Sequence, residues 1–235
     1  MNGLLFILIP IALALIAGMV YMAWLAEKKR REALAAVAAR LGWRFDPRRD
    51  REHDDEYAHF EIFRRGHSRA AFNTLTGEAE IGGRRFPAKA GDFMYKITTS
   101  TGKSTTTKTY RFSYLILHLP YAGVPDLLIR REGVLDKIAG AFGFDDIDFE
   151  SAEFSRRFCV KSPDKRFAYD VVHPRMIEFL LAGNPGAIDI EYSRCCLSDG
   201  RRRWEPQHFE ANLAWIGQFF DHWPQHVLAS LESAS

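Results

Sequence analysis

GLLFILIPIALALIAGMVYMAWLA (residues 3–26) contains no charged side chain, and the block EKKRR (residues 27–31) follows it directly. An α-helix rises about 1.5 Å per residue, so about 20 residues cross the roughly 30 Å hydrocarbon core of a bilayer. The stretch is therefore long and apolar enough to span a membrane as one helix. We predict that residues 1–26 form a transmembrane anchor and that the rest of the chain is tethered to the bilayer.

A cleaved signal peptide is the alternative interpretation of this stretch. Signal peptides begin with a basic segment, have a shorter apolar core and end in an Ala-x-Ala-like site. Here residues 1–3 carry no Lys or Arg, and the exit AWLA (residues 23–26) has bulky side chains in its middle and runs into cations. These features favour a transmembrane anchor that is not cleaved.

The charges beside the anchor predict its orientation. The basic flank consists of Lys28, Lys29, Arg30 and Arg31. The positive-inside rule places such a flank in the cytoplasm, so we expect an inner (plasma) membrane protein with residues 27–235 in the cytoplasm. The three cysteines are Cys159, Cys195 and Cys196. Exported domains more often carry paired cysteines, so the odd number agrees with this orientation and predicts free thiols.

The composition is that of a globular domain. Aromatic residues make up 13% and charged residues 26% of the chain, and about 200 residues after the anchor are enough for a proper core. The formal net charge is only +2. Nucleic-acid-binding proteins show a concentrated basic face, so we expect no nucleic-acid partner. No cofactor motif appears, and we expect no cofactor.

The chain after the anchor reads as a juxtamembrane helix over residues 27–42 and one α+β domain over residues 43–235. We predict strands at 43–45, 70–81, 86–98, 105–119, 126–131, 157–161, 188–197 and 202–204, with a hairpin turn at 198–200 between the last two. We predict helices at 133–142, 163–172 and 175–182, a long one from Glu205 and a short one after Pro224. This pattern predicts an antiparallel sheet with helices packed on one face.

The polar segment Thr98–Thr109 links two of these strands. It is almost entirely Thr, Ser, Gly and Lys, which is typical of a solvated loop. A loop that contacts phosphate or a partner is the alternative, although the glycine spacing of a phosphate-binding loop is absent.

The last long helix carries a wide aromatic stripe that includes Trp215 and Trp223. Such a stripe is typical of core, and any exposed part of it would form a partner surface. The run Arg201, Arg202 and Arg203 is the second dense group of cations. Together with Lys28–Arg31 it would contact anionic lipid, each cation contributing about 1 kcal/mol near the surface.

Residues 147–181 resemble a known family. The relevant segments are IDFE (147–150), EFSRRFCVKSPD (153–164), Ala168, HP (173–174) and FLL (179–181). They are similar to a family of uncharacterised bacterial proteins that have an N-terminal membrane anchor and a conserved domain of unknown function. The resemblance implies a bacterial, membrane-anchored protein in which a strand leads to an acid-capped helix and a proline-started second helix. It implies no catalytic residues.

Two groups of polar residues have side chains of the kind that bind metal ions. The run Asp145, Asp146, Asp148 and Glu150 offers carboxylates, but the glycine of a calcium-binding loop is missing, and an edge paired with Arg156 and Arg157 is the simpler interpretation. His222 and His226 have the i, i+4 spacing of a metal chelate on a helix, but Pro224 lies between them. We therefore predict no metal site.

A nucleophilic site would require Cys159 or Cys195 with His173. Cys159 lies in an apolar alternating stretch, where a cysteine is usually a small buried hydrophobe. We predict no catalytic residue. The favoured function is a non-enzymatic module that binds a lipid or a protein partner at the membrane. The alternative is a membrane-tethered enzyme, for example a hydrolase, with its site near His173 and the acidic run 145–150.

Overall fold

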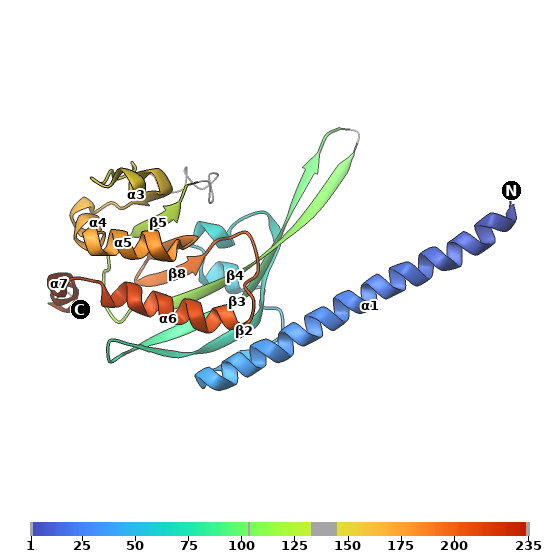
Figure 1. The fold of residues 1–235 in the computed structure, drawn as a ribbon, viewed down its shortest axis with the longest axis horizontal. Coiled ribbons are helices and arrows are strands. Elements are labelled where there is room, and N and C mark those ends of the chain that lie inside the picture. The colour runs from blue at the N-terminus through green and yellow to red at the C-terminus, as the bar shows by residue number, and fades with distance from the viewer. Residues whose placement is uncertain (1, 103, 133–144, 234–235) are drawn as a thin grey trace.

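The computed structural model of the protein describes residues 2–102, 104–132 and 145–233 (Figure 1). Its first element is helix α1 (Asn2–Leu41), a rod that extends far beyond the domain and carries the N-terminus at its free end. Within the described chain, the segment Ile9–Leu41 is the one helix long and apolar enough to cross a membrane, and its apolar part is not buried against the domain. The predicted anchor and juxtamembrane helix are thus one uninterrupted helix.

The domain is built on one antiparallel sheet of eight strands. The strands are β1 (Arg44–Asp46), β2 (His67–Ile81), β3 (Arg84–Ser100), β4 (Thr105–His118), β5 (Leu127–Arg131), β6 (Phe158–Lys161), β7 (Ala187–Glu191) and β8 (Arg194–Ser198). Their order in the sheet is β1-β2-β3-β4-β8-β7-β5-β6. The α+β fold class is confirmed.

Helices flank the sheet. They are α2 (His53–Glu56), the 3₁₀ turn η1 (Glu61–Phe63), α3 (Ala152–Arg157), α4 (Lys165–Val171), α5 (Pro174–Gly183), α6 (Gln207–Asp221) and α7 (Gln225–Ser233). Asp164 caps α4 by accepting a hydrogen bond from the Phe167 backbone N–H. The predicted helix over residues 133–142 lies outside the described residues.

The two faces of the sheet have separate cores. On one face, α1, α4, α5, α6 and α7 pack on alternate strand residues such as Ala88, Ala90 and Leu115. On the other face, α2 and η1 cover an aromatic cluster that includes Phe93 and Phe112. The long helices therefore occupy one face, as the sequence predicts, and among the described residues short turns cover the other.

The C-terminal end of α1 belongs to the first core. Leu34, Val37 and Ala38 on α1 are almost completely buried. Just after the helix, the Trp43 indole N–H donates to the Glu78 carbonyl at 2.9 Å, and its ring lies against Gly77, where a Cβ atom would come within 2.3 Å of the ring. The anchor helix is therefore packed into the domain and is not joined to it by a linker.

One predicted turn and one predicted strand are wrong. The hairpin between the last two strands turns at Tyr192 and Ser193, whose φ angles are 49° and 55°, and not at 198–200. A two-residue turn of this kind needs positive φ at both positions, for which Asn-Gly is the usual signal, so Tyr-Ser is easily missed. Residues 202–204 form a loop, not a strand.

The prediction of a loop over Thr98–Thr109 is wrong at residues 98–100 and 105–109, whereas the prediction that a strand begins at Thr105 is confirmed. β3 and β4 continue as a two-stranded ribbon beyond the last β2 pairing at Lys96, with pairs from Thr98↔Thr107 to Ser100↔Thr105. Figure 1 shows this ribbon projecting from the body of the domain. Threonine is a good strand former, so a polar but β-branched run pairs where composition alone suggests a loop.

Candidate functional site

The junction between the anchor helix and the sheet is a buried ion pair. The Arg30 guanidinium on α1 donates from Nε to Asp92 Oδ2 at 2.8 Å and from Nη2 to Oδ1 at 2.6 Å. The Asp92 side chain on β3 has no solvent exposure, and it also accepts from the Asn73 amide at 3.0 Å and the Ser113 hydroxyl at 2.7 Å. The remaining Arg30 nitrogen donates to the Trp204 carbonyl at 2.8 Å. Such a fully satisfied bidentate pair fixes geometry as well as charge.

A second ion pair lies one helical turn closer to the membrane. Arg203 Nη1 donates to Glu27 Oε2 at 2.9 Å, and the Asn73 amide donates to Glu27 Oε1 at 3.2 Å. Burial raises the pKa of Glu27, but the hydrogen bond and charge of Arg203 outweigh it and hold the pKa below its usual value. Glu27 is therefore ionised at neutral pH, and it ties the β8–α6 loop to the first turn after the apolar stretch.

The two predicted basic runs therefore lie together. Arg30 and Arg203 are used in internal ion pairs, so the prediction of a lipid-facing role for these two is wrong. The other members are exposed: Lys28, Lys29, Arg31, Arg201 and Arg202. We call these five residues the juxtamembrane basic patch. The sequence shows two separate runs, and the ion pairs of Arg30 and Glu27 bring them to the same part of the fold.

A cleft of about 510 Å³ opens beside this patch. It lies between the β8–α6 loop, the first half of α6 and the turn at 183–186. Its charged and aromatic lining consists of Arg131, Asp199, Arg202, Arg203, Trp204, Glu205, His208 and Trp215. The predicted interaction residues Arg202, Arg203 and Trp215 thus share one cleft. We call it the membrane-proximal cleft.

Trp215 on α6 and Trp223, which lies just after α6, have different environments. The Trp215 ring stacks on Phe179 at 4.9 Å, and its indole nitrogen has no hydrogen-bond partner among the described residues. Trp223 is only 3% exposed and packs edge-to-face on Phe167. Trp223 therefore belongs to the core, which is the favoured interpretation of a helical aromatic stripe, and it is not an exposed part of the stripe that could form a partner surface.

The alternative enzyme site near His173 is not assembled. His173 caps α5: its Nδ1 accepts from the Met176 backbone N–H at 3.4 Å, and its Nε2 donates to the His222 carbonyl at 2.9 Å. Both ring nitrogens are used, and neither faces a carboxylate among the described residues. His222 ends α6 while His226 lies on α7, where it is 3.5 Å from Asp170. The structure separates these two histidines onto two helices.

The acidic run 145–150 is irregular chain and not one face of a strand. Asp146 accepts a hydrogen bond from the Val160 backbone N–H at 2.8 Å, and Arg157 pairs with Glu153 instead of the run. Asp146, Glu132 and the Cys159 sulfur lie within 4.8 Å of one another, but two of the three residues are exposed. In the described structure the run thus contributes a local hydrogen bond to the backbone of β6.

The cysteines are free and buried, as predicted. Burial raises the pKa of the Cys159 thiol to about 11 and raises those of Cys195 and Cys196 further. A thiol must be deprotonated to act as a nucleophile. These three thiols are therefore protonated at neutral pH and behave as small apolar side chains.

Sequence reasoning missed Asp92, Asn73 and Ser113. One signal for Asp92 exists: it shares the strand parity of Ala88 and Ala90, which predicts an inward carboxylate on a buried face. A buried carboxylate needs a cation, and Arg30 is 62 positions away in the sequence. Only the fold identifies that partner.

The fold is similar to a solved structure. No protein-family model and no curated protein matches the sequence. The crystal structure of the mycobacterial trehalose monomycolate transport factor A, TtfA, matches with a TM-score of 0.53 and 9% sequence identity, and the match covers 84% of this chain and 96% of that chain. At this identity the likeness shows a shared fold alone.

Proposed function

We propose that the protein is a bacterial, single-pass membrane protein whose α+β domain is a non-enzymatic module that contacts polar lipid headgroups. The observation that carries the proposal is the pair of ion bridges, Arg30–Asp92 and Glu27–Arg203, which hold the juxtamembrane basic patch beside the exit of the anchor helix. The membrane-proximal cleft opens next to this patch and offers cations together with the indole of Trp215.

Distances along the helix favour contact with headgroups. Residues 28–31 follow the apolar stretch at once, so they lie roughly 3–8 Å beyond its end along a helix that rises about 1.5 Å per residue. The headgroup layer is roughly 5–7 Å thick on each side of the hydrocarbon core. Electrostatic attraction to anionic lipid extends over about 8 Å at physiological salt. Residues 28–31 therefore fall within the range of anionic headgroups, and the Glu27–Arg203 bridge ties the loop that carries Arg201 and Arg202 to the same part of α1.

The similar structure supports the lipid class. TtfA is described as a transport factor for trehalose monomycolate, which is a glycolipid. For this chain we infer from that similarity only that the domain contacts a polar lipid. A protein partner is the second candidate, and the β3–β4 ribbon favours it because both its edges are unpaired in the described structure and such edges accept an added strand.

The proposed orientation has a direct test. We expect the domain to be cytoplasmic, because the cations lie on the C-terminal side of the span. A C-terminal alkaline phosphatase fusion is then inactive, whereas a C-terminal fluorescent-protein fusion is bright. An active phosphatase fusion would place the domain on the opposite side and overturn this part of the proposal.

Lipid contact is tested with the double variant Arg201→Gln/Arg202→Gln. Each cation near an anionic surface contributes about 1 kcal/mol, so losing two weakens the contact by up to about 30-fold. The full chain is extracted from nanodiscs that contain equal phosphatidylglycerol and phosphatidylcholine, and the retained lipids are measured by mass spectrometry. We expect the wild type to retain phosphatidylglycerol preferentially and the double variant to lose most of this preference.

The matched control is Arg166→Gln. The Arg166 side chain is 92% exposed on α4, which lies at the end of the domain remote from α1 in Figure 1. We expect this variant to retain lipid as the wild type does. Equal retention of both lipids by the wild type would remove the lipid proposal, and one dominant co-purifying protein would then favour the second candidate.

A further inference from the structure

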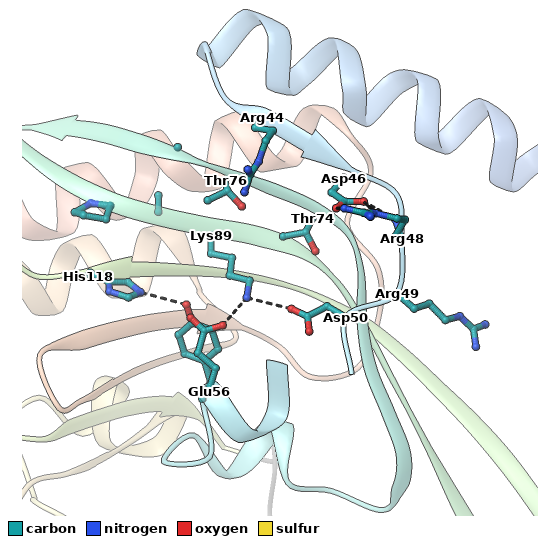
Figure 2. Close-up of a pocket in the computed structure, with 14 residues that line it drawn as sticks. Arg44, Asp46, Arg48, Arg49, Asp50, Glu56, Thr74, Thr76, Lys89 and His118 are labelled. Atoms are coloured by element: carbon teal, nitrogen blue, oxygen red, sulfur yellow. Dashed lines mark hydrogen bonds and ion pairs between the residues drawn. The ribbon is translucent and has the colours of Figure 1, made fainter. Parts of the chain in front are cut away.

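The sheet face covered by α2 carries a second hollow, of about 530 Å³ (Figure 2). At its inner side the Lys89 ammonium on β3 lies between two carboxylates, 2.7 Å from Glu56 Oε2 and 3.3 Å from Asp50 Oδ2. The Lys89 side chain is only 15% exposed, and its ammonium lies 5.1 Å from the centre of the Tyr57 ring. The Asp50 and Glu56 carboxylates thus already bind one cation, the Lys89 ammonium.

A buried histidine lies behind these carboxylates. His53 has no solvent exposure, and neither of its ring nitrogens has a hydrogen-bond partner among the described residues. Its ring is enclosed by the aromatic rings of Tyr57, Phe63, Phe93 and Tyr114, with centroids 4.6–5.7 Å away. Burial holds the pKa of His53 well below its usual value, so the ring is neutral and has a free lone pair. Buried polar groups without a partner are rare in proteins and need a reason.

The three side chains converge. Asp50, His53 and Glu56 each place one ligand atom within 4.8 Å of the other two. His53 and Glu56 are three positions apart on the single turn of α2, so they share a face. Asp50 is fixed by a two-way backbone bridge to Ala71 on β2, with both N–O distances 2.9 Å. One imidazole and two carboxylates, on supported backbone, are a donor set typical of zinc and related divalent ions.

We propose that Asp50, His53 and Glu56 bind one divalent transition-metal ion of the zinc class, and that Lys89 holds the two carboxylates together when the metal is away. Two carboxylates and a neutral imidazole balance the charge of a divalent ion, while Lys89 turns into the open hollow. Three protein ligands leave at least one position for water or a further ligand, as in sites that are not purely structural.

The lysine alone does not account for the site. Its ammonium is bonded to both carboxylates, yet the nitrogens of His53 remain without a partner. A metal ion would bond to one of the two His53 nitrogens and would replace the Lys89 ammonium as the partner of both carboxylates. Metal and Lys89 therefore compete for the same two oxygens, and this competition gives the proposal its sharpest test.

The experiment uses the untagged full chain in detergent, treated with chelator and then titrated with Zn²⁺ or Co²⁺. Bound metal is measured by elemental mass spectrometry, and Co²⁺ coordination by its visible absorption. We expect one ion per chain. We expect at least tenfold weaker binding in His53→Phe and in Asp50→Asn, and about tenfold tighter binding in Lys89→Met, because the competing ammonium is gone.

Two controls keep the result interpretable. His53→Phe preserves the aromatic packing, and its far-ultraviolet circular dichroism and thermal unfolding without metal show whether the domain still folds. His226→Gln removes an exposed histidine outside the site and is expected to bind metal as the wild type does. Absence of stoichiometric metal in both the wild type and Lys89→Met, or unchanged binding in a folded His53→Phe, would overturn the proposal.

Discussion

Replacing Arg30 by Ala is expected to lower the free energy of unfolding of the domain by about 3–5 kcal/mol. The reason is the partner that remains: Asp92 has no solvent exposure and loses its bidentate cation, while Asn73 and Ser113 supply only neutral hydrogen bonds and the remaining cation, Arg203 Nη1, lies 3.9 Å from Oδ2. An unpaired buried charge costs far more than an intact pair contributes. Urea unfolding of the full chain in detergent micelles, followed by tryptophan fluorescence, measures the change.

Arg40→Ala is the matched control for this prediction. Arg40 lies on the same helix and also makes a bidentate pair, with Glu210 at 2.7 and 2.8 Å, but its side chain is 56% exposed. Exposed pairs contribute little, so this variant is expected to unfold at nearly the wild-type urea concentration. Equal effects of Arg30→Ala and Arg40→Ala would show that the buried pair does not hold α1 on the sheet.

The domain is expected to be more stable at pH 5 than at pH 8 because of two neighbouring carboxyl groups on β7. Burial raises the pKa of Glu191 to about 7, and it also raises that of Asp189, whose Oδ1 is shielded from solvent. The folded state therefore binds more protons than the unfolded state between about pH 4.5 and 7, and the free energy of unfolding falls as the pH rises through this range. The Glu191 shift corresponds to at most about 3 kcal/mol, which solvent screening of this partly exposed side chain reduces to about 2 kcal/mol.

Glu191→Gln isolates this effect from other titrations. The amide keeps the size of the side chain and stays neutral, so the variant is expected to match the wild type at pH 5 and to exceed its stability at pH 8 by about 2 kcal/mol. Urea unfolding midpoints at both pH values give the comparison. A wild type and variant that differ equally at both pH values would contradict the assignment.

Much of the fold could be predicted from local patterns. The apolar stretch before Glu27, the alternation through β2, β3 and β4, and the proline that starts α5 each depend on neighbouring residues alone. The errors arise where local chemistry is ambiguous. Tyr192 and Ser193 adopt positive φ without the usual turn residues, and the threonines of the β3–β4 ribbon look like a loop by polarity.

The site was less predictable because it depends on contacts between distant residues. The sequence identifies the cations, but their division into internal and exposed groups depends on Asp92 and Glu27. Arg30 and Arg31 are neighbours with the same chemistry, and their 100° separation around the helix sends one into the domain and leaves the other at the surface. No sequence pattern before Asp92 shows which of these two arginines pairs inside the domain.

The unbroken passage of α1 from the apolar stretch into the core has a mechanical consequence. A helix that meets a thicker or thinner bilayer changes its tilt. Leu34, Val37 and Arg30 fix the C-terminal part of α1 to the sheet. The domain must therefore rotate together with the helix as one rigid body. If α1 spans a bilayer and the domain contacts headgroups, as we propose, bilayer thickness sets which surface of the domain faces them, so lipid chain length acts together with headgroup charge.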